Sequence, residues 1–320
     1  MTKLNAFFNL IRFKNLLIIV LIQVVIKFFL INAYLINSAL SNINFSIYLL
    51  ALITIVASGY IINDIYDIEI DTINKPETRI IEKKINKGFA IKAYYALNFI
   101  GISSGFYASY QVNRLWFGFI FIFFIFSLWR YSKNYKTVFL IGNLQVAFLT
   151  ALSILNLAVF DLIPVGIKIE NGSTMIFYII LFYAGFSFIT TFIREIIKDL
   201  EDAEGDKKIG ANTLAINYGT AKTKKITACL IFIPILGIAY FQYFQYSALI
   251  TSFSIKLSYW NVNLIAVLYT SLLQALLIIL LIKLSTSNTK SDFHFLSTLC
   301  KIIMLAGVLS IPLFHFLYQN

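Results

Sequence analysis

Two acidic segments of the sequence share one spacing of aspartates. The first begins at Asn63 and the second at Lys198, and each contains the pattern Asp-x-x-Asp-x-x-x-Asp. The two stretches that hold these patterns contain 12 of the 15 acidic residues. On a helix, positions i, i+3 and i+7 lie on one face. Each segment is therefore predicted to present three carboxylates together, and the six residues are Asp64, Asp67, Asp71, Asp199, Asp202 and Asp206.

The chemistry of such triads points to a divalent cation. Three neighbouring carboxylates repel one another, and all of them stay ionised only if a cation sits among them. Mg²⁺ binds one or two carboxylates, keeps several waters and takes further ligands from substrate phosphates. Two facing triads thus predict a diphosphate held between magnesium ions, with the six aspartates as metal ligands and catalytic residues. Solvated loop acids would explain a single Asp-x-x-Asp, but not the same longer pattern twice.

Basic and amide side chains flank both acidic segments. Arginine and lysine are natural ligands of diphosphate groups, although cytoplasmic loops of membrane proteins also collect these residues for reasons of topology. The predicted diphosphate-binding residues are Asn63, Arg79, Lys133, Lys136, Arg194, Lys198 and Lys207. Lys75, which follows the first triad, belongs to the same basic surroundings.

The elements that must position these residues are apolar helices. Hydrophobic residues make up 59% of the 320-residue chain, charged residues only 13%, and the mean hydropathy is +0.82. A soluble domain has about a quarter charged residues, so soluble, disordered and disulfide-rich classes are excluded. Continuous apolar runs of ~20 residues predict transmembrane helices. Nine are found, at residues 15–35, 45–62, 90–110, 115–129, 137–160, 175–193, 226–246, 262–282 and 295–317.

The basic residues predict the orientation of these spans. With the N-terminus in the cytoplasm, 22 of the 26 Lys and Arg residues fall on the cytoplasmic side; the exceptions are Lys27, Arg114, Lys168 and Lys256. Because cytoplasmic loops carry the Lys and Arg excess, we expect a multi-pass protein of the cell inner membrane. Its active-site loops would be cytoplasmic and its C-terminus outside. The same bias explains the net charge of +11 without a nucleic-acid partner.

Lys27 is the charge that lies deepest in a predicted span. A lysine in this situation can extend its apolar stem and bring the ammonium group to the lipid headgroups. We expect Lys27 to reach the outer interface in this way, in preference to a role in an internal cavity.

At its two acidic segments the sequence resembles the UbiA-type family of membrane prenyltransferases. The stretch from Asn63 to Pro76 is similar to the first family signature, and the stretch from Arg194 to Asp206 to the second. Weaker similarities lie around the fourth and fifth spans and at the entry to the first. They consist of Tyr131, Ser132, Lys133, Lys136, Gly142 and Asn143, and of Arg12 with Asn15, where Phe13 and Lys14 replace a usual Pro-x.

The resemblance implies a fold and an activity. The fold would be all-α, an integral membrane bundle of nine transmembrane helices around a central cavity, with residues 1–320 as a single domain. The activity would be Mg²⁺-dependent transfer of a polyprenyl group from its diphosphate to an acceptor bound near Arg12, Asn15 and Asn143. The partners would be the bilayer, a polyprenyl diphosphate and the acceptor, without a required protein partner.

The identity of the acceptor stays open at this point. A glycerol-phosphate lipid, such as geranylgeranylglyceryl phosphate, would correspond to the digeranylgeranylglyceryl phosphate synthase branch of the family, with a geranylgeranyl donor. Aromatic acceptors of the 4-hydroxybenzoate, homogentisate, naphthoate or chlorophyllide type are the alternative. The menaquinone branch usually has glycine before the last aspartate of the first motif, where this chain has Ile70. Overall resemblance favours the glycerol-lipid acceptor.

Two other protein classes use acidic residues in membranes. A cation transporter needs polar residues along a path through the spans, whereas these acids lie at the ends of the spans. CDP-alcohol phosphotransferases need an Asp-Gly at their first acids, and here Ile65 follows Asp64. Both classes are therefore disfavoured.

Overall fold

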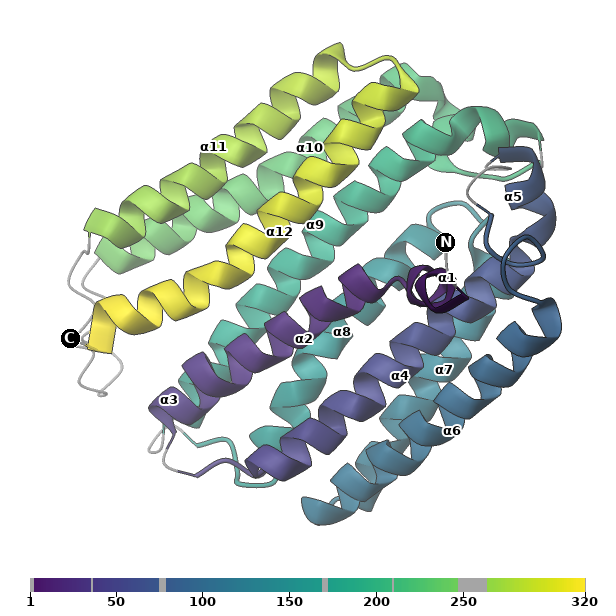
Figure 1. Ribbon diagram of the computed structural model, residues 1–320. Coiled ribbons are helices and arrows are strands. Elements are labelled where there is room, and N and C mark those ends of the chain that lie inside the picture. Colours follow the sequence, from purple (N-terminus) through teal and green to yellow (C-terminus); the bar gives the residue numbers. More distant parts are fainter. Residues whose placement is uncertain are drawn as a thin grey trace.

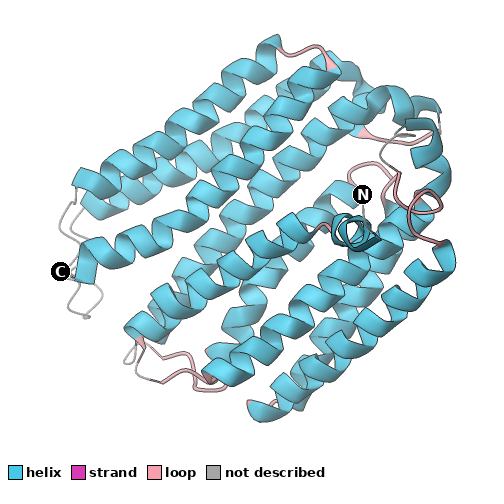
Figure 2. Cartoon of the chain, in the orientation of Figure 1, coloured by secondary structure: helices cyan, strands magenta, loops and turns pink. Residues whose placement is uncertain are grey.

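The computed structural model describes residues 3–35, 37–74, 79–168, 172–208, 210–246 and 264–319. Over these residues the secondary structure is helical, and no β-strand occurs in them (Figure 2). The predicted all-α class is thus confirmed. Lys75 and Lys256 lie outside the described residues.

The helices follow one another with short connections. The first half of the chain forms α1 (Lys3–Leu10), α2 (Phe13–Ile26), η1 (Lys27–Ile31), α3 (Asn32–Tyr34), α4 (Asn42–Tyr66), α5 (Ile68–Asn74), α6 (Lys87–Gln111), η2 (Leu115–Phe117), α7 (Gly118–Arg130), η3 (Tyr131–Tyr135) and α8 (Ile141–Asp161). The second half forms α9 (Ser173–Lys208), α10 (Leu214–Tyr246), α11 (Leu264–Thr286) and α12 (Lys290–Gln319).

The described helices combine into nine long rods, which match the nine predicted spans. The segments α2, η1 and α3 form one rod, and η2, α7 and η3 form another. Eight of the rods are long and apolar enough to cross a membrane. The exception is the 25-residue helix α6, whose Lys87, Lys92 and several polar residues lower its hydropathy. The protein is an integral membrane protein.

Helix α6 nevertheless packs closely along α4. A Cβ atom at Gly101 of α6 would lie 2.5 Å from Cγ1 of Ile55 on α4, so only glycine permits this approach. The N-termini of both helices are capped by side chains: Ser41 Oγ accepts from the Asn44 amide at 3.2 Å, and Asn86 Oδ1 accepts from the Gly88 amide at 2.7 Å. Helix α6 is thus held within the bundle by α4.

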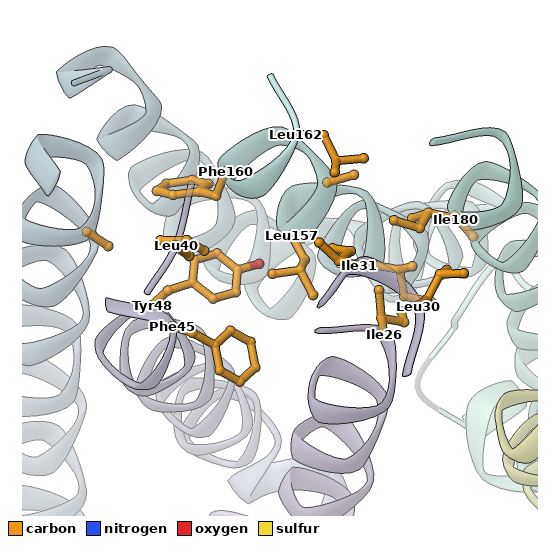
Figure 3. Packing of buried hydrophobic residues seen from close by; sticks show 14 of the residues in the cluster. Ile26, Leu30, Ile31, Leu40, Phe45, Tyr48, Leu157, Phe160, Leu162 and Ile180 are labelled. Carbon is orange, nitrogen blue, oxygen red and sulfur yellow. The ribbon is translucent and has the colours of Figure 1, made fainter. Parts of the chain in front are cut away.

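Apolar side chains fill the bundle in two main clusters. One joins α2, η1, α4, α6, α7, α8, the first half of α9 and the end of α12 around Tyr48 and Phe160 (Figure 3). The other joins the second half of α9 to α10, α11 and α12 around Ile197 and Leu280. The long helix α9 takes part in both clusters and therefore connects the two halves of the molecule (Figure 1).

The structure corrects the expectation for Lys27. Its side chain is 0% exposed, and its Nζ donates to Asp161 Oδ2 at 2.6 Å and to the Leu40 carbonyl at 2.7 Å. Asp161 is also 0% exposed, and its Oδ1 accepts from the Leu40 amide at 2.8 Å. The sequence could not indicate this pairing, because Asp161 is 134 residues away from Lys27 along the chain. Snorkelling to the interface was therefore predicted instead. The ammonium group also donates to Ser38 Oγ at 3.0 Å, so it has a counter-ion and three hydrogen bonds without water.

Both acidic segments lie at the same end of the bundle. Helix α4 leads into α5 there, and the last turns of α9 reach the same end (Figure 1). The Lys27–Asp161 pair belongs to the opposite end, where α3 leads to α4 and α8 ends. The helices thus separate a polar, acid-rich end from an end closed by one buried ion pair.

Candidate active site

The first acidic segment crosses a break between two helices. Helix α4 ends at Tyr66, Asp67 caps it with φ −86° and ψ 0°, and α5 begins at Ile68. Asn63 Nδ2 donates to Asp67 Oδ2 at 2.7 Å, and the Asp71 amide donates to the Asp67 carbonyl at 2.7 Å. The helical hydrogen bonds nevertheless continue through Asp67, whose amide donates to the Asn63 carbonyl at 3.0 Å, so the shared face of the three aspartates stays a prediction. Asp67 is only 5% exposed, so its carboxylate lies within the protein.

The second acidic segment lies on one unbroken helix. Asp199, Asp202 and Asp206 are spaced along the last turns of α9, and all three are partly buried. Asn143 Nδ2 of α8 donates to Asp199 Oδ2 at 2.8 Å. This segment therefore has the single helical stripe that its spacing predicts.

The segment from η3 to the start of α8 connects the two acidic segments. Lys136 Nζ forms an ion pair with Asp67 of the first, and Asn143 holds Asp199 of the second. Between these contacts, Tyr131 lies within electrostatic range of both Asp67 and Asp199. A single short stretch of chain thus brings one carboxylate of each triad to the same region.

A glycine permits this stretch to fold back on itself. A Cβ atom at Gly142 would lie 2.7 Å from the carbonyl oxygen of Tyr135 and 3.2 Å from Cα of Lys136. The clash would be with backbone atoms, which cannot move aside as a flexible side chain can. Gly142 therefore allows the residues before α8 to approach its first turn, which brings Lys136 and Asn143 close to their carboxylates.

Arg12, predicted to bind the acceptor, lies beside the first triad. Its Nη2 donates to Asp64 Oδ1 at 3.2 Å, and its guanidinium lies 4.8 Å from the centre of the Tyr60 ring. Burial lowers the pKa of the Arg12 guanidinium, but Asp64 raises it, and the resulting pKa is above its ordinary value. Asn15 Nδ2 contacts the Tyr60 hydroxyl at 3.5 Å. Arg12 is thus a permanent cation next to a predicted metal ligand.

The predicted diphosphate-binding residues separate into three groups. Asn63 and Lys136 contact Asp67, as described above. Arg194 Nη1 instead pairs with Glu195 Oε1 at 2.5 Å, and Lys198 Nζ lies 3.4 Å from the other oxygen of that carboxylate. Glu195 itself is 7% exposed. The structure therefore shows a second, separate ionic group on α9.

Three other predicted diphosphate-binding residues do not contact the aspartates. Arg79 Nη1 donates to Thr72 Oγ1 at 2.5 Å. Lys133 lies 5.0 Å from the centre of the Trp129 ring, and Lys207 is exposed near the end of α9.

The acidic side chains suit Mg²⁺ better than a metal ion that takes all its ligands from the protein. Within the described residues, no three His, Cys, Asp or Glu side chains form a ready metal cluster. The donors that converge here are carboxylate and amide oxygens, the hard ligands that Mg²⁺ prefers. Since Mg²⁺ takes several ligands from water and phosphate oxygens, the residues present fit it without a closed protein cage.

Three residues of this region had no assigned role in the sequence interpretation. Tyr131 belongs to a weak motif, and only the fold shows that it interacts electrostatically with an aspartate of each triad. Glu195 lies within the second signature, but its burial could not be predicted. Lys301 lies inside the predicted span 295–317 and had no role there, yet in the structure it interacts electrostatically with Arg194 and Arg12.

Comparison with known proteins supports this architecture. A digeranylgeranylglyceryl phosphate synthase from Sulfolobus acidocaldarius is 36% identical over 188 residues, which are 58% of this chain and 62% of that protein. The aligned chain thus covers less than two thirds of this relative's length. A solved structure described as digeranylgeranylglyceryl phosphate synthase is 26% identical, with a TM-score of 0.65 over 98% of this chain and 99% of that one.

A more distant structure shares the fold, and a family model matches most of the sequence. A UbiA homologue from Archaeoglobus fulgidus, bound to DMAPP and Mg²⁺, is 14% identical, with a TM-score of 0.57 over 96% of this chain and 98% of that one. The model of the UbiA prenyltransferase family matches residues 20–299. With this match and the two acidic segments at one end of a helical membrane bundle, the chain belongs to the UbiA prenyltransferase family.

Proposed function

We propose that this protein transfers a geranylgeranyl group from its diphosphate to geranylgeranylglyceryl phosphate, in a magnesium-dependent reaction within residues 1–320. The observation that carries the proposal is the bridge made by Lys136 and Asn143, which tie the two triads together at Asp67 and Asp199. The glycerol-lipid acceptor is supported by the names of the relatives with which the chain aligns.

The aspartates are the residues that would hold the cation. Asp64, Asp67 and Asp71 would do so on one side, and the stripe on α9 on the other. When bound, magnesium neutralises the negative charge that grows on the leaving diphosphate. The site is suited to this because two carboxylates already have fixed orientations, Asp67 through Asn63 and Asp199 through Asn143.

The basic residues assist the departure of the diphosphate. As the allylic C–O bond breaks, its electron pair passes to the diphosphate oxygen, and hydrogen bonds from Lys136 strengthen as that charge develops. Lys198 is placed to do the same beside Asp199, with which it interacts electrostatically. Arg79, Lys133 and Lys207 stay proposed as further contacts that would form when the diphosphate binds.

The acceptor hydroxyl then attacks the allylic carbocation. A new C–O ether bond forms, and the hydroxyl proton is released. Water must be excluded because it would capture the same cation. The apolar interior formed by the helices supplies that exclusion, and aromatic faces, numerous among the 31 Phe and 19 Tyr, can stabilise the cation.

The positive-inside bias supports a cytoplasmic position for the acid-rich end. We expect single cysteines at positions 83 and 222 to react with an impermeant thiol reagent only after cells are opened, and one at position 168 to react in intact cells. These positions carry exposed lysines. The native Cys229 and Cys300 are first replaced by serine. Labelling of positions 83 and 168 from the same side would contradict the proposed orientation.

Product analysis tests the proposed reaction directly. Membranes containing the protein are incubated with labelled geranylgeranyl diphosphate, magnesium and either geranylgeranylglyceryl phosphate or a set of aromatic acceptors. We expect a labelled product that contains two prenyl ethers on one glyceryl phosphate, formed only when magnesium is present. Turnover of an aromatic acid or quinol alone would refute the lipid acceptor and favour the aromatic branch.

A further inference from the structure

Three structural elements bring four basic side chains to the region beside the triads. Arg12 precedes α2, Arg194 and Lys198 lie on α9, and Lys301 lies on α12. Lys301 interacts electrostatically with Arg12, Arg194 and Lys198, which are positive like itself. It also interacts with the negative carboxylate of Glu195. These elements also contact one another, since α12 packs against both α2 and α9.

The carboxylates nearby are already engaged. Glu195 is shared by Arg194 and Lys198, and Asp64 pairs with Arg12. No ion pair or hydrogen bond of Lys301 occurs within the described residues. Arg12, Arg194 and Lys198 therefore each have a carboxylate partner, whereas no ion pair within the described residues balances the charge of Lys301.

Lys301 lies within a membrane span, where a charge without a counter-ion is unusual. It is the twelfth residue of α12, about 16 Å along the helix from Lys290. It lies inside the apolar run 295–317, where it follows the buried Cys300 but is itself exposed. An ionisable residue within a membrane span is costly unless it meets a counter-charge or lines a polar site. An anion that binds beside Lys301 would supply that counter-charge.

Arg194 has a hydrogen-bond donor available for such an anion. Its Nη1 is bound to Glu195, but its Nε is buried and makes no hydrogen bond with any described residue. Buried donors are normally satisfied. A phosphate oxygen is a suitable acceptor, because arginine and lysine form their strongest hydrogen bonds to phosphates and carboxylates.

We propose that Arg12, Arg194 and Lys301 form a separate anion site that holds the phosphate monoester of the acceptor lipid. This rests on the proposed function and extends it, because it assigns Arg194 to the acceptor instead of to the donor diphosphate. Arg12 pairs with Asp64 at the first triad, so the acceptor is held next to the metal-binding end. The donor diphosphate stays with the aspartates, Lys136 and Lys198.

Steady-state kinetics with both substrates tests the assignment. We expect Lys301→Gln and Arg194→Gln each to raise the KM for geranylgeranylglyceryl phosphate by roughly 10- to 100-fold, as for the loss of one charge-assisted hydrogen bond. The KM for geranylgeranyl diphosphate should stay within about twofold. Lys301→Arg should retain most of the acceptor affinity. Lys225→Gln, which removes an exposed lysine of α10, is the matched control and should change neither constant.

A binding measurement separates the phosphate site from catalysis. Detergent-solubilised protein is titrated, without donor and in excess EDTA, with radiolabelled geranylgeranylglyceryl phosphate and with the same lipid lacking its phosphate. The wild-type protein should prefer the phosphorylated lipid, and Lys301→Gln should lose that preference. Strong competition by inorganic phosphate alone would mean that the site binds any free phosphate and would contradict a lipid-specific role.

The outcomes distinguish the two proposals. If the wild-type protein uses geranylgeranylglyceryl phosphate but the Lys301 and Arg194 variants leave its KM unchanged, the anion site is refuted and the proposed reaction stands. Equal increases in both KM values would assign these residues to the donor and also overturn the inference. If the wild-type protein does not use the phosphorylated lipid at all, the proposed reaction itself fails. If Lys301→Gln does not fold, Lys301→Arg and Arg194→Gln decide.

Discussion

Asp67→Asn should lower the rate of prenyl transfer by roughly 100-fold or more while the protein stays folded in the membrane. Asparagine has nearly the same shape and can still accept the hydrogen bond from Asn63, but it lacks the charge that would hold magnesium and that now pairs with Lys136. Asp202→Asn on α9 should have a comparable effect. The measurement is kcat at saturating donor and acceptor over a magnesium titration.

A control variant distinguishes the loss of a metal ligand from the loss of a negative charge near the site. Glu204→Gln removes one negative charge from the same end of α9, where Glu204 is exposed. It should leave kcat and the magnesium requirement nearly unchanged. Both aspartate variants should also need more magnesium for half-maximal activity. Activity close to that of the wild-type protein at low magnesium, in either of them, would remove the case for a metal site formed by these residues.

Lys27→Met should destabilise the protein by about 3–5 kcal/mol, because it leaves Asp161 as a buried charge without its counter-ion. Lys27→Met combined with Asp161→Asn should recover most of this loss. The asparagine is neutral, and its oxygen can still accept the hydrogen bond from the Leu40 amide. Thermal unfolding of the detergent-solubilised protein measures both effects as shifts in Tm.

The matched control for this pair is Lys14→Met. Lys14 begins the same rod at the other end, and its side chain is exposed. Its replacement should leave Tm almost unchanged, since exposed charges contribute little to stability. A Lys27→Met protein as stable as the wild type would mean that the ion pair adds nothing. A double variant no better than the single one would mean that charge balance is not the cause of the loss.

Several properties followed from the sequence because they depend on local order. The length of each apolar run is enough to predict a membrane helix, since an exposed backbone cannot be tolerated in lipid. The rods therefore appear where the apolar runs lie, although α6, whose hydropathy is lower, is not among the eight that are apolar enough to cross a membrane. The spacing of Asp199, Asp202 and Asp206 likewise predicted the acidic stripe of α9. In the first motif, the same spacing missed the helix break at Asp67.

The sequence by itself therefore determined the class of protein, the positions of the rods and the two acidic motifs, because helix periodicity and hydrophobic length act over neighbouring residues. Only the tertiary structure decided which charges meet. Lys136 reaches Asp67 across 69 residues, and Lys27 reaches Asp161 across 134. Lys301 joins Arg194 only because α12 packs on α9. Such contacts depend on how helices far apart in the chain pack together, and the residue types alone do not specify that packing.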